Sequence, residues 1–483
     1  MILLLPLLIP IAGAAILLGF GTNGRARIIA VVAGAAEIIA LLRVVLVVYS
    51  SGPVQFGRYL RVDGLSSFFL LNLALVFGLV LVYSLDYLRH VEGERFSSAR
   101  WFYALLLFFV FTMVGVCLSA NLGLLWIMME ATTLASALLV GFYNTRGAVE
   151  AGWKYLIVCT VGIAFALFGT IVLYLAAIKS GLPPENALDW TALMAAVPRL
   201  GGDVRLLRLA FVFVVVGYGT KIGFVPMHSW LPDAHAESPS PISALLSAVL
   251  LNCAMYTLLR YDAIISRATG THFTHTLLLA FGVLSLVVAG LLIVVQRDLK
   301  RLLAYSSIEH MGIVAIGVGL GGGLGLYGAL LHTFSHSFGK TLLFFAAGNV
   351  RQNYGTLRME RIGGLARSFP KTALALALGS LAIVGLPPFA LFVSEFAILN
   401  AAFSQSRIWV AAAFLVTLTV VFGGMLHHLF GMFFRETKIT PVPARMAFSE
   451  ALPIAIAVVG LVWFGVHIPA GFKDLINQAI AVL

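Results

Sequence analysis

The sequence is short of charged residues. Only 11% of its 483 residues are Asp, Glu, Lys or Arg, whereas 61% are hydrophobic; soluble domains carry about 25% charged residues. A soluble globule of this size cannot bury so much apolar surface, so most of the chain must face lipid. This excludes cytosolic enzymes, disordered chains and nucleic-acid-binding proteins. The net charge of +11 is typical of basic membrane-flanking loops that meet anionic headgroups.

No segment is polar enough to form a separate soluble domain. Cysteine is scarce as well. The 3 cysteines (Cys117, Cys159 and Cys253) lie in apolar runs without CxxC spacing. We therefore expect no disulfide framework, no metal site and no redox cofactor. The chain begins with an apolar run that lacks a preceding basic segment, which predicts a spanning helix rather than a cleaved signal.

Long hydrophobic runs, in contrast, are abundant. A bilayer core needs about 20 apolar residues per helix, and we predict an all-α polytopic membrane protein with about fourteen transmembrane helices. The runs begin near residues 1, 25, 65, 101, 121, 153, 207, 241, 273, 300, 324, 371, 407 and 450. The distribution of Lys and Arg among the loops predicts that both termini lie on the outer side of the plasma (inner) membrane.

Two of the predicted helices are interrupted by proline. Helix 7 carries Pro226 just past Lys221, and helix 12 carries Gly-Leu-Pro-Pro at 385–388. In lipid, such breaks persist only where protein or water satisfies the freed backbone groups. The broken helix is fourth in two consecutive five-helix blocks, which predicts inverted repeats of helices 4–8 and 9–13. The predicted units are residues 1–100 (helices 1–3), 101–265 (first repeat), 266–440 (second repeat) and 441–483 (helix 14).

Ionisable residues inside the predicted spans are the candidate functional residues. Each costs about 2.5–3.5 kcal/mol in a membrane unless it pairs or faces water. Glu130 in helix 5 and Lys221 before the first break are predicted to pair and to exchange a proton. His332, His336 and Lys340 recur every four residues, so they line one face of helix 11 and predict a proton path. We expect no metal there, because Lys340 would repel a cation and no carboxylate shares this face.

The second half of the chain carries further candidates. Glu395 follows the break in helix 12 and is predicted to be the terminal carboxylate of that half. His310 in helix 10 is predicted to relay protons, and its neighbour Glu309 could tune it.

Other polar residues have a structural alternative. The polar entrance predicted after the helix 7 break would be lined by His228, Asp233 and His235, whose alternative role is capping and loop hydrogen bonding. Glu37 could pair with Arg43 inside helix 2. His427 and His428 could anchor the inner end of helix 13.

These residues lie within motifs of a known family. The stretch KIGFVPMHSWLPDAHAESPSPISA (221–244) resembles the signature of the antiporter-like membrane subunits of respiratory complex I, and the segments 298–312 and 385–396 match as well. The resemblance implies fourteen core helices, inverted repeats, and buried Glu, Lys and His that carry protons. It also implies an ion pair of Glu130 with Lys221, a central relay at His310 and an exit carboxylate at Glu395.

One segment narrows the resemblance and one residue departs from it. The segment 336–350 looks most like the F subunit of hydrogenase-4 and related formate hydrogenlyase-type complexes. Many complex I members place a lysine in helix 8 where this chain has Asn252. A neutral amide exchanges no proton in this pH range, so Lys340 could substitute, or conduction could be interrupted.

The leading prediction is a proton-translocating membrane subunit of a redox-driven complex, such as a membrane-bound hydrogenase or a complex I-like NADH/quinone oxidoreductase. Its expected partners are other membrane subunits, peripheral redox or other soluble subunits, and the bilayer. The alternatives are a Mrp-type cation/proton antiporter subunit, a membrane partner of an inorganic-carbon uptake complex, and a structural scaffold. The coupled reaction, and whether sodium replaces protons, stay open.

Overall fold

The protein is a helical membrane protein, as its composition predicts. The computed structural model describes residues 1–21, 23–90, 98–436, 441 and 446–483. Within this part, ten helices are long and apolar enough to cross a bilayer. The strands found there are β1 (Val54–Phe56) and β2 (Leu60–Val62), an antiparallel hairpin in which Val54 faces Val62.

The helices follow one another with short connections. The first group is α1 (Leu5–Phe20), α2 (Asn23–Ser51), α3 (Gly64–Tyr87), α4 (Ala99–Leu118), α5 (Leu122–Val140) and α6 (Arg146–Lys179). The second group is α7 (Trp190–Leu200), α8 (Val204–Ile222), α9 (Leu231–Glu237), α10 (Ser240–Leu245), the π-helical turn η4 (Leu246–Leu250), α11 (Leu251–Thr269) and α12 (Thr271–Val294). The third group is α13 (Leu299–Leu320), α14 (Gly322–Tyr354), α15 (Leu365–Ser368), α16 (Pro370–Ile383), α17 (Ala390–Ser404), α18 (Ile408–Phe434), α19 (Phe448–Val466) and α20 (Ala470–Val482). Single 3₁₀ turns are η1 (Leu88–His90), η2 (Pro184–Asn186), η3 (Gly201–Asp203) and η5 (Met359–Arg361).

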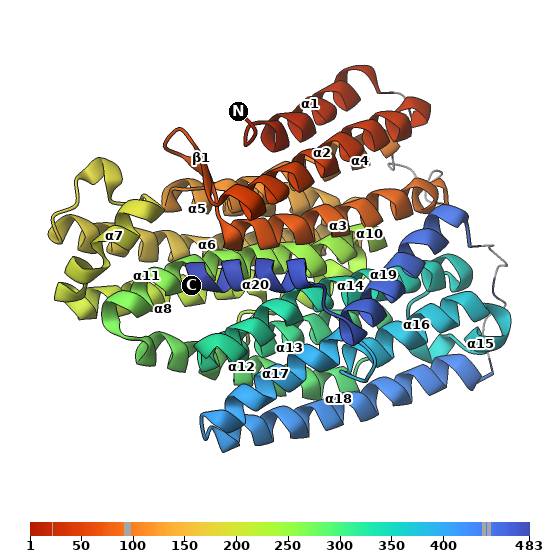
Figure 1. Ribbon diagram of the computed structural model, residues 1–483. Helices are drawn as coiled ribbons and strands as arrows, with labels where there is room; N and C mark the ends of the chain where they lie inside the picture. Colours follow the sequence, from red (N-terminus) through yellow and green to blue (C-terminus); the bar gives the residue numbers. More distant parts are fainter. Residues whose placement is uncertain (22, 91–97, 437–440, 442–445) are drawn as a thin grey trace.

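The long helices form one bundle, with α1 and α18 at opposite edges (Figure 1). Helix α14 lies inside it and packs against α13, α16, α17 and α19. Every residue from 328 to 350 of α14 is buried. The polar face predicted on this helix is therefore held inside the protein, away from lipid.

Both predicted helix breaks are present. Helix α8 ends at Gly223 (φ +88°), and Gly385 (φ +69°) follows α16. Glycine reaches this left-handed region without a steric penalty. The backbone N–H of Val225, freed by the first break, donates to Ser285 Oγ on α12 at 3.0 Å. The break is thus satisfied by protein, as a membrane interior requires.

Helices α5 and α13 begin in the same way. Asn121 caps α5 and Asp298 caps α13, and each side chain accepts from the backbone N–H groups two and three residues further on. The first N–H of each helix donates to a carbonyl in a distant loop, that of Leu188 for α5 and that of Leu357 for α13, both at 2.9 Å. Two separate parts of the chain therefore repeat one local design.

Candidate functional site

The first cluster of candidate functional side chains lies where α5, α6 and α8 meet. Lys221, the penultimate residue of α8, is fully buried. Its Nζ donates to Thr133 Oγ1 at 2.8 Å and to the Tyr155 hydroxyl at 2.6 Å. The Thr133 hydroxyl in turn donates to Glu130 Oε2 at 3.4 Å, and Thr160 Oγ1 donates to Glu130 Oε1 at 2.8 Å. We call these five residues the first-half cluster.

The predicted direct pairing of Lys221 with Glu130 is not what the geometry holds. The hydroxyl of Thr133 stands between the ammonium and the carboxylate, accepting from one and donating to the other. The physical reason is the position of the two residues along α5. Thr133 is one helical turn beyond Glu130 and on the same face, so it contacts Lys221 before Glu130 can. The two charges are connected by a hydroxyl group that can pass a proton.

Aromatic and hydroxyl groups complete the surroundings of Lys221. Its Nζ lies 4.8 Å from the centre of the Tyr155 ring, a cation–π contact. The Tyr155 hydroxyl is 2.7 Å from Ser136 Oγ, and Ser136 donates to the Thr132 carbonyl at 2.5 Å. Tyr155 therefore accepts from Lys221 and donates to Ser136, which gives the ammonium polar contacts without a second full charge.

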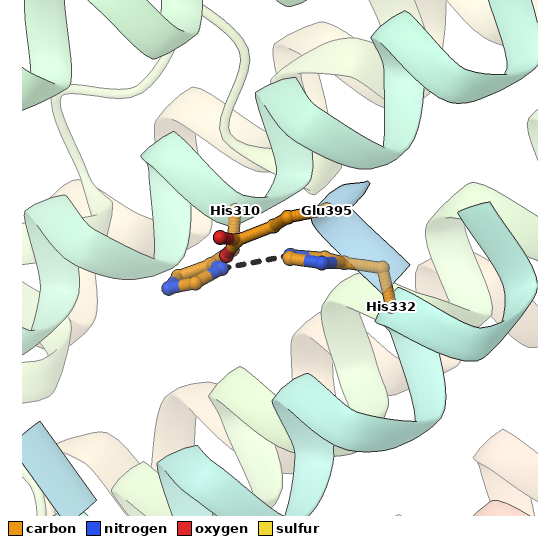
Figure 2. A group of neighbouring side chains, drawn as sticks. All are labelled: His310, His332 and Glu395. Carbon is orange, nitrogen blue, oxygen red and sulfur yellow. Dashed lines mark hydrogen bonds between the residues drawn. The ribbon is translucent and has the colours of Figure 1, made fainter. Parts of the chain in front are cut away.

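A second cluster lies between α13, α14 and α17. His310 Nδ1 and His332 Nε2 are 2.8 Å apart (Figure 2). His332 Nδ1 is 2.9 Å from Ser394 Oγ. The Ser394 hydroxyl donates to the Leu391 carbonyl at 2.7 Å, so its oxygen accepts from His332 Nδ1–H. His332 Nε2 is then the acceptor, and His310 Nδ1 carries the proton that joins the rings. The contacts thus fix one tautomer for each histidine.

Glu395 of α17 joins the two imidazoles. One carboxylate oxygen of Glu395 and one nitrogen from each of His310 and His332 lie within 4.8 Å of one another, and all three side chains are buried (Figure 2). Gly385 makes room for this carboxylate, because a Cβ at that position would collide with Glu395. With Ser394, these three residues are the second-half cluster.

This grouping corrects one premise of the sequence argument. The histidine face of α14 has no carboxylate of its own, but the fold brings Glu395 to it from another helix. Two imidazoles and a carboxylate are ligand types that can hold either a shared proton or a transition-metal ion. The residues that could hold a metal are therefore His310, His332 and Glu395.

Three further titratable residues border the second-half cluster, and all are fully buried. Glu309 Oε2 is 3.9 Å from His310 Nε2, and the His336 ring centre is 5.1 Å from that of His310. Lys340 Nζ donates to the Leu303 carbonyl at 3.0 Å. Neither nitrogen of His336 nor either oxygen of Glu309 has a hydrogen-bond partner in the described part of the chain. These groups offer sites for the water that a proton path needs.

The three predicted entrance residues do not form one group. Asp233 holds two ion pairs at 2.6 Å, one with Lys154 and one with Arg301. His228 is half-buried near the first break, whereas His235 is fully buried, with neither ring nitrogen hydrogen-bonded in the described structure. Asp233 therefore links the ends of α6 and α13, and His235 points into the bundle.

Uncharged amides occupy the space between the halves. Asn252 Nδ2 donates to the Ala248 carbonyl at 2.7 Å and to Ser337 Oγ at 2.9 Å, and Asn72 Nδ2 bonds the same two groups at 3.2 and 3.0 Å. Ala248 lies in the π-helical turn η4, a local irregularity that is frequent at functional sites. Polar contacts thus cross the middle of the bundle without a charged residue at position 252.

The remaining candidates have structural surroundings. Glu37 is buried and neither of its oxygens is hydrogen-bonded in the described chain, while Arg43 is exposed on the same helix. They lie six residues apart and so face different sides of α2, which is why the expected pair does not form. His428 Nε2 lies 3.2 and 3.1 Å from the carbonyls of Ile293 and Val294. It anchors α18 to the end of α12, as predicted.

Comparison with known proteins identifies the family. Residues 119–422 match the family described as NADH:quinone oxidoreductase/Mrp antiporter, TM. The chain belongs to this family. It is 39% identical over 419 residues to the Hydrogenase-4 component F homolog of Methylacidiphilum infernorum, which covers 86% of each chain. The resemblance seen in the motifs is confirmed, and the protein is an antiporter-like membrane subunit of the complex I and membrane-bound hydrogenase family.

Solved structures share the fold of this antiporter-like subunit. A chain of the membrane-bound sulfane sulfur reductase, an archaeal respiratory membrane complex, superposes with a TM-score of 0.88 at 23% identity, covering 99% of this chain and 97% of that one. A chain of respiratory complex I from Thermus thermophilus gives 0.84 at 25% identity, with 100% and 99% covered. The subunit therefore has the architecture of membrane subunits from respiratory complexes.

Proposed function

We propose that this subunit translocates protons through its membrane interior as part of a redox-driven complex, such as a membrane-bound hydrogenase or a complex I-like oxidoreductase. One observation carries the proposal: titratable and hydroxyl groups, most of them buried, gather at both helix breaks, in the first-half and second-half clusters. Membrane-embedded ionisable groups are expensive and are retained on ion pathways. The subunit itself supplies the path, and its partners supply the redox chemistry.

The proposed path spans two repeats among fourteen membrane helices. The spans are α1 to α6, α8 with α9, α10 with α11, α12 to α14, α16 with α17, α18 and α19. The repeats run from α4 to α11 (101–265) and from α12 to α18 (266–440), flanked by 1–100 and 441–483; the junction at 440–441 borders residues outside the described part. The matching starts of α5 and α13, and a Gly-x-x-Pro break in the fourth helix of each repeat, support this division.

We further propose that both termini lie on the outer side of the plasma membrane. Four arginines, Arg297, Arg301, Arg351 and Arg358, gather at one end of the bundle around the ends of α12 and α14. Basic residues accumulate on the cytoplasmic side of membrane proteins. This end is therefore assigned to the cytoplasm.

The alternative function is cation/proton exchange, as the family description includes Mrp antiporters. The second-half cluster would then bind the exchanged cation. Its ligands argue against sodium, because two of the three are imidazole nitrogens and hard alkali-type cations prefer oxygen ligands. Protons are the ion that these groups bind best.

The test is proton uptake into vesicles that contain the purified complex. Lys221→Ala and Glu130→Ala are expected to abolish uptake at unchanged yield of the complex, because each removes a charge of the first-half cluster. Lys179→Ala and Glu185→Ala are matched controls, since Lys179 is exposed at the last residue of α6 and Glu185 is exposed outside the spans. Full uptake by either cluster variant would reject the proposal. Sodium-dependent uptake that is absent without sodium would favour the exchanger.

A further inference from the structure

The cytoplasm-assigned end of the bundle carries a basic trough between α12, α13, α14 and α18. Its larger part is a cavity of about 700 Å³ lined by Arg297, Arg301, Arg351 and Arg358. A cavity of about 150 Å³ adjoins it, shares Arg297 and adds Arg435. We refer to the two cavities together as the basic trough.

Three of these arginines have no side-chain partner among the residues that the structure describes. Arg301 pairs with Asp233 at 2.6 Å. Arg297, Arg358 and Arg435 form no ion pair and no side-chain hydrogen bond with any residue that the structure describes. Three guanidinium groups thus line the trough with donors that no described residue engages.

Acidic residues do not cancel this charge. The trough carries three carboxylates, those of Glu237, Asp298 and Glu360, against five arginines. Asp298 is already engaged as the cap of α13, where it accepts from the N–H groups of Lys300 and Arg301 at 3.0 and 3.1 Å. The trough therefore suits a ligand with at least one negative charge.

An apolar surface borders the trough. Val295 lines the larger cavity and is 66% exposed at the end of α12. Phe430 and Phe434 do not line either cavity but are next in sequence to Gly431 and Arg435, which line the smaller one. They are 57% and 69% exposed, with stacked rings 5.8 Å apart. His428 on the same turn of α18 contacts the end of α12 and holds the two helix ends together. A ligand that fits both surfaces has an anionic head and an apolar tail.

We propose that the basic trough binds an anionic phospholipid, with its phosphate at Arg297 and Arg358 and its acyl chains along Val295, Phe430 and Phe434. The planar guanidinium group donates two parallel hydrogen bonds to a phosphate, which lysine cannot do. Basic pockets between helices on the cytoplasmic side bind such headgroups from an anionic leaflet. The trough shares no residue with either proton cluster, so this inference stands independently of proton translocation.

Lipid binding to the full-length chain in mild detergent tests the proposal. Delipidated protein is titrated with phosphatidylglycerol and, separately, with phosphatidylcholine, and bound lipid is counted by native mass spectrometry. The double variant Arg297→Gln/Arg358→Gln is expected to bind phosphatidylglycerol about 10- to 30-fold more weakly, because each lost arginine removes one surface cation–phosphate attraction. The control Arg199→Gln/Arg407→Gln removes two exposed arginines from the opposite end and is expected to bind as wild type does.

A melting temperature equal to that of wild type shows that each variant is folded. Equal phosphatidylglycerol affinity in the trough variant and the control overturns the proposal, as does equal binding of phosphatidylcholine and phosphatidylglycerol by the wild type. Inorganic phosphate is the third arm. If millimolar phosphate displaces the lipid completely and binds with the same dependence on Arg297 and Arg358, the ligand is a soluble phosphate and the lipid assignment is rejected.

Discussion

At the scale of single residues, Thr133 is the uncharged group that connects the two charges of the first-half cluster. It accepts from Lys221 at 2.8 Å and donates towards Glu130 at 3.4 Å. In the proposed path, a proton that leaves the ammonium crosses this hydroxyl, which must reorient its own hydrogen bond before the carboxylate is reached. The longer of the two contacts marks the step at which the path is weakest.

Thr133→Val is therefore expected to reduce proton uptake about tenfold or more, since loss of one buried hydrogen bond costs about 1–3 kcal/mol. Valine keeps the shape of the side chain and removes only the hydroxyl. Thr133→Ser restores the hydroxyl and is expected to retain most of the activity. Initial rates of vesicle acidification provide the measurement, and equal rates in the Val and Ser variants would show that protons bypass this residue.

Variants of Lys340 and Asn252 distinguish two possible proton routes between the two halves of the protein. Lys340 is a fully buried lysine on the helix that carries His332 and His336, and its Nζ donates to the Leu303 carbonyl. Asn252, in contrast, is a neutral amide bound to Ala248 and Ser337. We expect Lys340→Met to stop proton uptake and His336→Gln to weaken it. Asn252→Leu is expected to leave uptake largely intact.

Asn252→Lys, which installs the residue common in related subunits, is expected to be tolerated or slightly damaging because it adds a buried charge. The four variants are compared in the same vesicle assay at equal protein content. Loss of uptake in Asn252→Leu with full uptake in Lys340→Met would move the relay from α14 to α11.

At the scale of elements, the second helix break is shaped around a side chain. Gly385 has a positive φ, and a Cβ there would collide with the Glu395 carboxylate. The break therefore does two things at once: it turns the chain between α16 and α17 and it seats the carboxylate beside His310 and His332. The element and the cluster depend on the same glycine.

Gly385→Ala is expected to abolish proton uptake and to destabilise the protein. Gly322→Ala is the matched control, because Gly322 has nearly the same φ (+66°) but no atom within 4 Å of its Cβ position. The control is expected to lose about 1 kcal/mol of stability from the strained φ alone and to keep its uptake. Thermal melting and vesicle assays on both variants distinguish backbone strain from displacement of Glu395. Equal loss of uptake in both variants would show that Gly385 matters only for the conformation of the turn.

The elements were also the part that the sequence predicted best. Run length and hydropathy predicted a helical membrane protein, and ten helices of the described part are long and apolar enough to span a bilayer. The four-residue spacing of His332, His336 and Lys340 predicted one face of α14, and all three residues are buried there. Spacing along one helix does not report what a second helix brings, so Glu395 beside those histidines was missed. Hydroxyl residues such as Thr133 were missed as well, although its position one turn after Glu130 was the available signal.

At the scale of the whole molecule, the proposed repeats place different chemistry at equivalent positions. Thr133 follows the cap of α5 by the same number of residues as His310 follows the cap of α13. Asp233 follows Gly223 at the same distance as Glu395 follows Gly385. One half thus uses hydroxyl groups and an ion-paired carboxylate where the other uses imidazoles and a buried carboxylate. A proton that crosses both halves meets groups of rising basicity at the equivalent positions, from hydroxyl to imidazole.

The exposed surface of α5 and α6 carries a carboxylate within a membrane span. Glu130 is only half-buried, and its partner Thr160 is exposed. Around them, Ile127, Leu134, Ile157 and Val161 are each more than half exposed. A carboxylate that faced lipid would cost about 2.5–3.5 kcal/mol. A second membrane subunit is therefore expected to cover this surface of α5 and α6.

An Ile157→Cys variant labelled with a thiol-reactive photo-cross-linker, such as a maleimide benzophenone, should therefore cross-link to another membrane subunit of the complex on illumination, whereas Val32→Cys on α2, also exposed, should not. The three native cysteines are buried and give no background reaction. Absence of a cross-linked product from Ile157→Cys in the intact complex would mean that lipid, or water at Glu130, covers this face instead.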